Sequence, residues 1–255
     1  MVKKRTKKVK RTKRKASKLP RNFFLLTLLM GLVYLLYRFY NRDHSVKQKE
    51  ALTINIPSGF QGFGIDVSHH QGVIDWDVLL NKEGYDTLVD FVYCKATEGS
   101  TFVDSEWYRN RKELMKREIP HGAYHFFRPS VDPEEQAKHF LYHWTKQEGD
   151  LPPVLDIETE GENDKQLIES IDIWMNAVEQ RTGMRPIIYT SLHFFETKFA
   201  KSFPNHSFWI AAYSRKPGSI DDPRIIHWQY SESGSLPGIE TAVDLNVTKL
   251  PFQRN

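Results

Sequence analysis

From Phe63 onward, apolar runs of strand length alternate with longer segments of helical pattern. This alternation constrains the fold most, because apolar runs buried on both faces are typical of parallel strands covered by helices. The runs that we expect to form strands are 63–67, 88–94, 121–127, 152–157, 186–190, 207–213, 225–230 and 241–245. The segments that we expect to form helices lie near 75–82, 105–118, 133–148, 164–181 and 191–200.

These segments predict an α/β fold: an irregular (β/α) barrel of about eight strands with an incomplete set of helices, preceded by a single transmembrane helix. Later connections such as 214–224 are too short and too rich in Pro and Gly to hold full helices. The helix at 133 has a well-marked start, with Asp132 as N-cap and Pro133 at the first helical position.

The charge of the chain is divided unevenly. Residues 1–50 carry 16 Lys and Arg against two acids, whereas residues 51–255 carry 20 Lys and Arg against 30 Asp and Glu. The net charge of +4 therefore comes from the N-terminal segment. Because the folded region is acidic, we expect no nucleic-acid partner.

The N-terminal segment is typical of a membrane anchor. Twelve Lys and Arg between Lys3 and Arg21 precede sixteen uncharged residues, 22–37, which as a helix cover roughly 24 Å of a ~30 Å hydrocarbon core. No small-x-small cleavage signal follows, which favours an uncleaved signal anchor over a signal peptide. By the positive-inside rule, the basic end stays in the cytoplasm and the folded domain lies outside the cytoplasmic membrane.

Four regions follow from these observations. We expect a basic cytoplasmic segment at 1–21, a transmembrane signal anchor at 22–40, a linker at 41–60 and a catalytic barrel at 61–255. The single cysteine, Cys94, has no intrachain disulfide partner, and its apolar surroundings predict a core position.

The run PPVLDIE places two carboxyls two residues apart, Asp156 and Glu158. In a strand such side chains point to the same face and lie roughly 6.5–7 Å apart, at the end where barrel enzymes place catalysis. Two like charges beside apolar neighbours raise the proton affinity of one of them. One carboxyl is then an acid and the other a carboxylate, which is the division that glycosidic bond cleavage needs. A loop-capping Asp156 beside a solvated Glu158 is the structural alternative.

Two further acids, Asp66 and Asp244, stand at equivalent strand ends. The negative charge of four acids at one rim needs a metal ion or a cationic transition state nearby. An oxocarbenium-like sugar is such a cationic transition state. Aromatic residues that could stack on sugar rings, or belong to the core, also occur at strand ends: Tyr124, Phe126, Phe127, Tyr189, Tyr213, Trp228 and Tyr230.

Several histidines raise the alternative of a metal site. His69, His70, His121 and His125 have Asp66 as a possible carboxylate companion. Because neither HExxH nor a similar spacing is present, we interpret them as hydrogen-bonded groups around the pocket. We expect no metal and no cofactor.

The motifs that carry a family resemblance follow one another in order along residues 62–252. They are GIDVSHHQGVIDW at 64–76, KATEG at 95–99, GAYHFFRP at 122–129, PVLDIE at 153–158, IIYT at 187–190, WIAAY at 209–213, HWQY at 227–230 and DLN at 244–246. In this order they resemble the motifs of the glycoside hydrolase family 25 lysozymes. One Asp-x-Glu pair is weak support, whereas eight ordered motifs are strong.

The resemblance implies an N-acetylmuramidase that cuts the β-1,4 bond from N-acetylmuramic acid to N-acetylglucosamine in peptidoglycan, with net retention. It implies that Glu158 donates a proton, and that Asp156 either stabilises the positive reaction centre or orients the substrate's acetamido group. Asp66 and Asp244 would complete the floor of the site. The groups expected to bind substrate are Tyr124, Tyr189, Trp228, Gln229, Glu98 and His125.

Two other functions remain open at this point. A non-catalytic peptidoglycan-binding barrel is one, because a fold does not prove activity. A metal-dependent amidase or deacetylase on the same polymer is the other. The four intact acids favour the hydrolase, and we expect a monomer whose partners are the glycan strand and, through the N-terminal helix, the membrane.

Overall fold

The computed structural model describes residues 31–34, 56–80 and 89–251. The chain divides into two units, 1–47 and 48–255. In the first unit, residues 31–34 form a helical turn. The predicted segment 1–21 and most of the predicted anchor 22–40 and linker 41–60 lie outside the described residues. Within the described ranges, no helix has the length and apolar character needed to cross a membrane.

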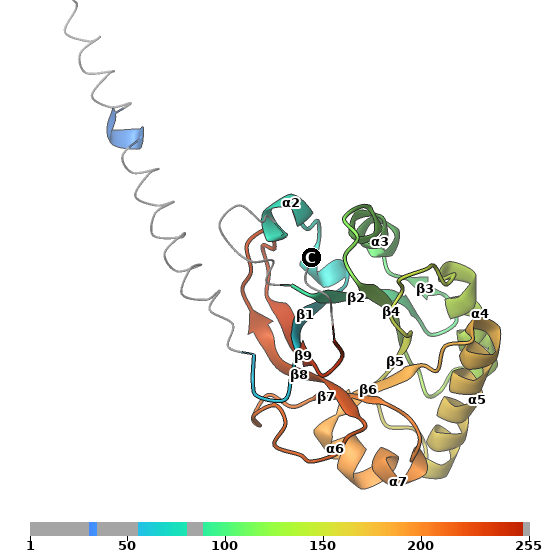
Figure 1. Ribbon diagram of the computed structural model, residues 1–255. Coiled ribbons are helices and arrows are strands. Elements are labelled where there is room, and N and C mark those ends of the chain that lie inside the picture. Colours follow the sequence, from blue (N-terminus) through green and yellow to red (C-terminus); the bar gives the residue numbers. More distant parts are fainter. Residues whose placement is uncertain (1–30, 35–55, 81–88, 252–255) are drawn as a thin grey trace, which may run out of the picture. The chain divides into compact units, whose positions relative to one another are not determined.

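In the second unit, the strands form a closed barrel, seen along its axis in Figure 1. Around the barrel the order is β1-β9-β8-β7-β6-β5-β4-β2, and pairing of β1 with β2 closes it. The strand bounds are β1 Gly62–Val67, β2 Phe91–Glu98, β4 His121–Phe126, β5 Val154–Ile157, β6 Ile187–Ser191, β7 Phe208–Ala211, β8 Ile225–Gly234 and β9 Val243–Thr248. A short strand β3, Phe102–Val103, pairs with the end of β2. The predicted irregular barrel is therefore confirmed.

The barrel is parallel except at β9, which runs antiparallel to both β1 and β8. Parallel neighbours need a crossover of a dozen or more residues, and the segment 235–242 between β8 and β9 is too short for one. A hairpin is the connection that this length allows. It brings the start of β9 to the rim where the parallel strands end.

The outer helices form the incomplete set that the sequence predicts. The longer ones are α3 Trp107–Lys116, α4 Pro133–His143 and α5 Asp164–Thr182. The short ones are η1 His69–Gln71, α2 Trp76–Leu79, α6 Leu192–Phe194, η2 Phe195–Phe199, which is a π-helix, and α7 Ala200–Ser202. Asp132 is the N-cap of α4 and accepts a hydrogen bond from the backbone N–H of Glu135 at 3.0 Å, as predicted. This helix ends at His143 because Trp144 is extended, at φ −120° and ψ 119°.

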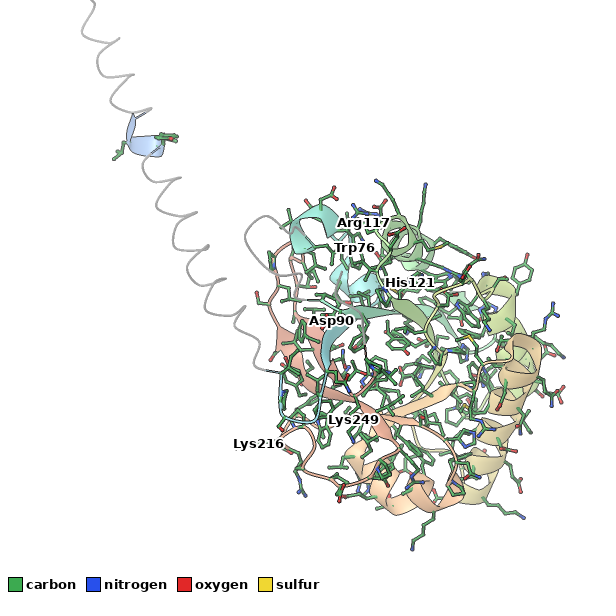
Figure 2. All side chains as sticks on the ribbon, viewed as in Figure 1. Trp76, Asp90, Arg117, His121, Lys216 and Lys249 are labelled. Carbon is green, nitrogen blue, oxygen red and sulfur yellow. The ribbon has the colours of Figure 1, made fainter. Side chains whose placement is uncertain are left out.

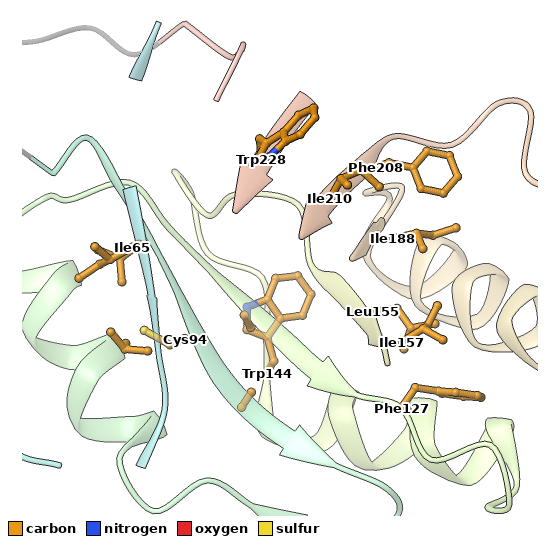
Figure 3. Close-up of a cluster of buried hydrophobic side chains, with 14 of the residues drawn as sticks. Ile65, Cys94, Phe127, Trp144, Leu155, Ile157, Ile188, Phe208, Ile210 and Trp228 are labelled. Atoms are coloured by element: carbon orange, nitrogen blue, oxygen red, sulfur yellow. The ribbon is translucent and has the colours of Figure 1, made fainter. Parts of the chain in front are cut away.

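Outward-facing side chains of the strands form the larger core, packed under the helices. Figure 3 shows part of this cluster, with labels on Ile65, Cys94, Phe127, Trp144, Leu155, Ile157, Ile188, Phe208, Ile210 and Trp228. The burial of Cys94 agrees with its predicted core position. A smaller aromatic cluster fills the barrel interior with Phe91, Tyr93, Val154, Ile187, Tyr189 and Trp209. The interior is tight, since a Cβ at Gly122 would overlap the Tyr93 ring.

An ion pair fastens α2 to the end of α3. Nη2 of Arg117 lies 2.6 Å from Oδ1 of Asp77. Figure 2 labels Arg117 and Trp76, the first residue of α2. Trp76 itself is buried in the larger core.

Candidate active site

The barrel strands bring three Asp residues to one rim. Asp156 lies near the carboxyl end of β5, and Glu158 follows directly after that strand. Asp66 lies near the carboxyl end of β1 and is paired in register with Asp244 of β9. Asp244 reaches this rim because β9 is antiparallel and begins there. The four acids predicted from the sequence are therefore brought together.

These acids face a cavity of about 290 Å³. Its walls come from η1, β1, β2, β4 to β9 and the loops that follow the strands. The lining residues are Asp66, Ser68, His70, Lys95, Tyr124, Phe126, Val154, Asp156, Glu158, Tyr189, Trp209, Tyr213, Gln229, Glu232 and Asp244. Acidic and aromatic groups predominate, a combination that suits a polar ring with a cationic reaction centre.

A hydrogen-bond network fixes the Asp66 side of the floor. Oδ2 of Asp66 accepts from Nε2 of Gln229 at 2.9 Å and from Nδ2 of Asn246 at 2.8 Å. The amide oxygen of Gln229 accepts from the hydroxyls of Tyr189 and Tyr213, each at 2.7 Å. Because nearly every group in this network is buried, its members hold one another in a single arrangement.

Asp156 and Glu158 differ in their surroundings. Asp156 is buried, whereas Glu158 is exposed at the cavity. Burial raises the pKa of Asp156 well above its ordinary value, and the neighbouring Glu158 raises it further. Burial also raises the pKa of Glu158, whereas the neighbouring Tyr189 hydroxyl and the charge of Lys95 lower it. Two adjacent carboxyls with raised pKa values favour the state in which the pair keeps one proton.

Asp66 and Asp244 form a second carboxyl pair. Burial raises the pKa of Asp66 although Asn246 and Gln229 donate hydrogen bonds to it. The pKa of Asp244 is also raised, first by burial and then by the charge of Asp66. The floor of the cavity therefore retains protons around neutral pH, and four acids coexist there without four full negative charges.

This arrangement can carry out general acid catalysis beside a cationic centre. A protonated Glu158 is positioned to give a proton to a leaving oxygen, and an ionised Asp156 can face the developing positive charge. Oδ1 of Asp156 is buried and has no hydrogen-bond partner within the described part of the chain. A bound N–H group would satisfy this oxygen.

Two residues expected to bind substrate lie on the opposite side of their strands. Trp228 is fully buried among the outer core, and its indole N–H donates to the Ala212 carbonyl at 3.2 Å. Adjacent residues of a strand point to opposite faces, so Trp228 faces outward because Gln229 faces the cavity. For the same reason His125 faces away from the cavity that Tyr124 lines. The expectation of direct substrate contact by Trp228 and His125 does not agree with these positions.

His125 has a structural role in the outer core. Its Nδ1 lies 2.7 Å from the hydroxyl of Thr97 and its Nε2 lies 3.2 Å from Oε1 of Gln136. Its ring stacks on Trp174 with centroids 5.5 Å apart. Burial lowers the pKa of His125 to about 3, so the ring is neutral.

Glu98 also stands apart from the cavity lining. Its Oε2 pairs with Nζ of Lys95 at 2.6 Å, and its Oε1 accepts from Nε of Arg128 at 2.9 Å. Both oxygens of Glu98 are bound by cations. Glu98 therefore holds Lys95, which lines the cavity, but does not line the cavity itself.

The sequence analysis missed several groups around the site. Lys95, Trp209 and Ser68 line the cavity, and Asn246 supports Asp66 from beneath. Strand alternation could have identified Lys95 from Tyr93, and register could have identified Trp209 from its partner Tyr189. Glu232 gave no such signal, because its place depends on the length of the β8–β9 hairpin.

The ring centroids of His69 and His70 lie 4.0 Å apart, but the four histidines do not gather around one point. His70 lines the cavity, whereas His69 pairs with Asp104 at 2.7 Å and His121 lies near Asp150 at 3.4 Å. In the described ranges, no group of three or more His, Cys, Asp or Glu is arranged to hold a metal ion.

Known proteins are similar to this chain in sequence and in fold. A family model described as glycosyl hydrolases family 25 matches residues 65–239. Protein YegX of Escherichia coli K12, described as uncharacterized, is 34% identical over 227 residues, which cover 89% of this chain and 81% of YegX. Lysozyme M1 of Streptomyces globisporus is 31% identical over 205 residues, covering 74% of this chain and 67% of that protein.

A solved structure agrees with the sequence comparisons. The family 25 glycosyl hydrolase from Bacillus anthracis superposes with a TM-score of 0.69 at 29% identity, over 77% of this chain and 93% of that chain. The family model spans well over half of the residues, and the barrel carries its acids at one rim. The chain therefore belongs to family 25 of the glycosyl hydrolases.

Proposed function

We propose that this chain hydrolyses the β-1,4 bond between N-acetylmuramic acid and N-acetylglucosamine in peptidoglycan, with net retention at the anomeric carbon. Membership of family 25 makes the chain a glycoside hydrolase, and its lysozyme and muramidase relatives support lysozyme-type hydrolysis of peptidoglycan. The sugar linkage and the stereochemistry are the finer parts of the proposal.

One observation carries the mechanism: Asp156 and Glu158 line one cavity, and Asp156 has a buried oxygen without a partner among the described residues. An acetamido N–H of the substrate is a donor of the required kind. Asp156 then holds the acetamido group so that its carbonyl oxygen attacks the anomeric carbon while Glu158 protonates the leaving oxygen. This bond formation and cleavage give a cyclic oxazolinium ion and a free hydroxyl on the departing sugar.

Water completes the reaction by attacking from the face of the sugar ring that the departing sugar has left. Glu158, now a carboxylate, takes a proton from the water that attacks the anomeric carbon, and the acetamido group is regenerated. Two inversions give net retention.

The linkage is tested by digesting purified peptidoglycan and reducing the products with borohydride before mass spectrometry. We expect reduced N-acetylmuramic acid as the new end group, in the presence or absence of a chelator. Reduced N-acetylglucosamine would contradict the linkage, and peptides released from intact strands would indicate an amidase. Intact polymer would favour the non-catalytic binding barrel.

The stereochemistry is tested by proton NMR of a short glycan during the first turnovers. We expect the β-anomer first, followed by slow mutarotation. Initial α-anomer would contradict retention, and a covalent glycosyl–Asp156 adduct in a mass spectrum would contradict the assisted route.

We also propose that residues 22–40 anchor the hydrolase in the cytoplasmic membrane, with 1–21 inside, 41–60 as a linker and a monomeric barrel outside. The sixteen uncharged residues after a basic block support this arrangement. Cell fractionation should leave the full chain in the membrane pellet after alkaline carbonate washing. Release of a shortened chain into the medium would contradict the uncleaved anchor, and a dimer mass by light scattering in detergent would contradict the monomer.

A further inference from the structure

Lys95 is a buried cation in the wall of an acidic cavity. Its residue is 8% exposed, and no other described residue lining the cavity is a Lys or Arg. The position is set by β2, where Lys95 lies opposite Tyr124 of β4 and is therefore on the inner face. Burying a charge is costly unless it is paired, so this ammonium needs partners.

The ammonium is held in place from several directions. Nζ of Lys95 lies 2.6 Å from Oε2 of Glu98. It also lies 4.9 Å from the ring centroid of Phe126 and 5.6 Å from that of Phe102. Arg128 binds the other oxygen of Glu98, which leaves that carboxylate little freedom to move. The cation is thus fixed rather than carried on a free side chain.

Asp156 lines the same cavity as this cation, and its pKa is subject to competing influences. Burial and the charge of Glu158 raise the pKa of Asp156, whereas the charge of Lys95 lowers it. Lys95 also lowers the pKa of Glu158. The titratable and charged groups that line the same cavity are Asp66 of β1, His70 of η1, Lys95 of β2, Tyr124 of β4, Glu158 after β5, Tyr189 of β6, Tyr213 after β7, Glu232 of β8 and Asp244 of β9. Among them the fixed positive charge belongs to Lys95.

We propose that Lys95 is a positioning residue of the hydrolysis: locked by Glu98, it offsets part of the effect of burial on Asp156, so that this carboxyl gives up its proton more readily and accepts the substrate's acetamido N–H. This inference rests on the function proposed above. Glu98, expected from the sequence to contact substrate, then acts through Lys95, and Arg128 acts through Glu98.

Removing the charge of Lys95 tests its electrostatic effect on Asp156 through the pH profile of kcat. Replacing Lys95 by Met removes the charge and keeps much of the apolar stem. An opposite charge within about 4–6 Å lowers a carboxyl pKa by roughly 1–3 units. In Lys95→Met, both limbs of the pH profile of kcat should therefore move up by about one unit or more. Lys95→Arg should largely restore the parent profile.

Lys198 provides a matched control. Its side chain is 11% exposed, its Nζ pairs with Glu160 at 2.8 Å and Asp164 at 2.6 Å, and it lies 5.1 Å from the Phe194 ring centroid. It does not line the cavity. Lys198→Met should lose stability to a similar extent and leave both limbs in place.

The measurement is kcat and KM between pH 3 and 9 on purified peptidoglycan for the full chain and its variants, with circular dichroism to confirm folding. A parallel loss at every pH in Lys95→Met, with unmoved limbs, would overturn the inference. If Lys95→Met does not fold, Lys95→Gln decides, because it also removes the positive charge that lowers the pKa of Asp156 and should move the acid limb up. An increase in KM of Lys95→Gln with unmoved limbs would overturn the inference. Absence of cleavage by the parent chain would contradict the proposed function and not this inference alone.

Discussion

Two tryptophans illustrate how side-chain direction decides the role of a residue. Trp209 of β7 faces the cavity and donates from its indole N–H to Oδ1 of Asn246 at 2.9 Å, whereas Trp228 of β8 is packed in the outer core. Both rings are buried and belong to adjacent strands. Only Trp209 has atoms on the cavity side, so it has access to a sugar ring.

Replacement of each ring should therefore affect a different quantity. Trp228→Ala should reduce the free energy of unfolding by about 3–5 kcal/mol, because it leaves a large hole in the core. The folded fraction should keep its KM. Trp209→Phe should raise KM several-fold, since Asn246 loses a donor and the wall loses surface. Urea unfolding and steady-state kinetics check the pair, and a higher KM in a folded Trp228 variant would contradict the assignment.

Much of the site was predictable residue by residue because strand alternation is strict. Asp66, Asp156, Glu158 and Asp244 line the cavity as predicted, and so do Tyr124, Tyr189 and Gln229. The expectations for Trp228 and His125 disregarded the same alternation, because each adjoins a residue that faces inward. Glu98 differs in another way. Its partners Lys95 and Arg128 depend on the bend of β2 between Lys95 and Thr97, which a linear sequence does not reveal.

At the scale of elements, close approach inside the barrel depends on glycine. The inner face of β4 at Gly122 lies against the Tyr93 ring of β2, and the inner face of β1 at Gly64 lies against Phe91. Without these glycines the large aromatic rings that fill the lower barrel could not fit. The strands that carry the acids are thus supported from below by packed rings.

Gly122→Ala should destabilise the chain by about 1–3 kcal/mol, because an added Cβ overlaps a ring that has no free space to enter. Gly183→Ala is a useful comparison, since Gly183 is the left-handed C-cap of α5, at φ 68°, and nothing lies within 4 Å of its added Cβ. Its cost should arise from backbone strain alone. Thermal unfolding measures the loss of stability in both variants. Steady-state kinetics near 25 °C should show lost activity only in the Gly122 variant, because there the barrel strands are displaced. Equal kinetics in both variants would contradict the packing argument.

The sequence predicted the elements better than their ends and directions. The strands and longer helices occur where expected, because their apolar runs are strongly periodic. The antiparallel direction of β9 was not predicted, although the short segment 235–242 could have indicated a hairpin. Helix α4 ends five residues before the expected position because Trp144 turns its ring into the core, a tertiary contact that local pattern does not contain.

At the scale of the whole molecule, stability and pH are linked through buried histidines. His227 lies inside the barrel between Phe91, Tyr93 and Trp209, with ring centroids 5.2 to 5.8 Å away. Neither of its ring nitrogens has a hydrogen-bond partner within the described residues. Burial lowers the pKa of His227 to about 3, below the ordinary value of 6.5. Between these two pKa values, the His227 ring is protonated in the unfolded chain and neutral in the folded chain.

His227 makes the folded chain less stable at acid pH. Because the folded-state pKa is depressed, the stability contributed by neutral His227 is present above pH 6.5 and is lost as pH falls toward 3. His227→Phe removes both this titration and the unpaired nitrogens. It should stabilise the chain by about 1–3 kcal/mol at pH 7 and more at pH 4. Denaturant unfolding at both pH values checks this, and a variant with the parent's pH dependence would contradict it.

The proposed catalysis depends above all on the pair formed by Asp156 and Glu158. The most direct measurement is the initial rate at which purified peptidoglycan gains reducing ends, compared among the parent, Glu158→Gln and Asp156→Asn. Loss of the proton donor or of the acetamido-holding carboxylate should each lower kcat by about 10²–10⁴-fold while circular dichroism stays unchanged. Parent-like rates in either folded variant would contradict the assignment of the pair and require another cavity group, such as Asp66 or Asp244, to perform the chemistry.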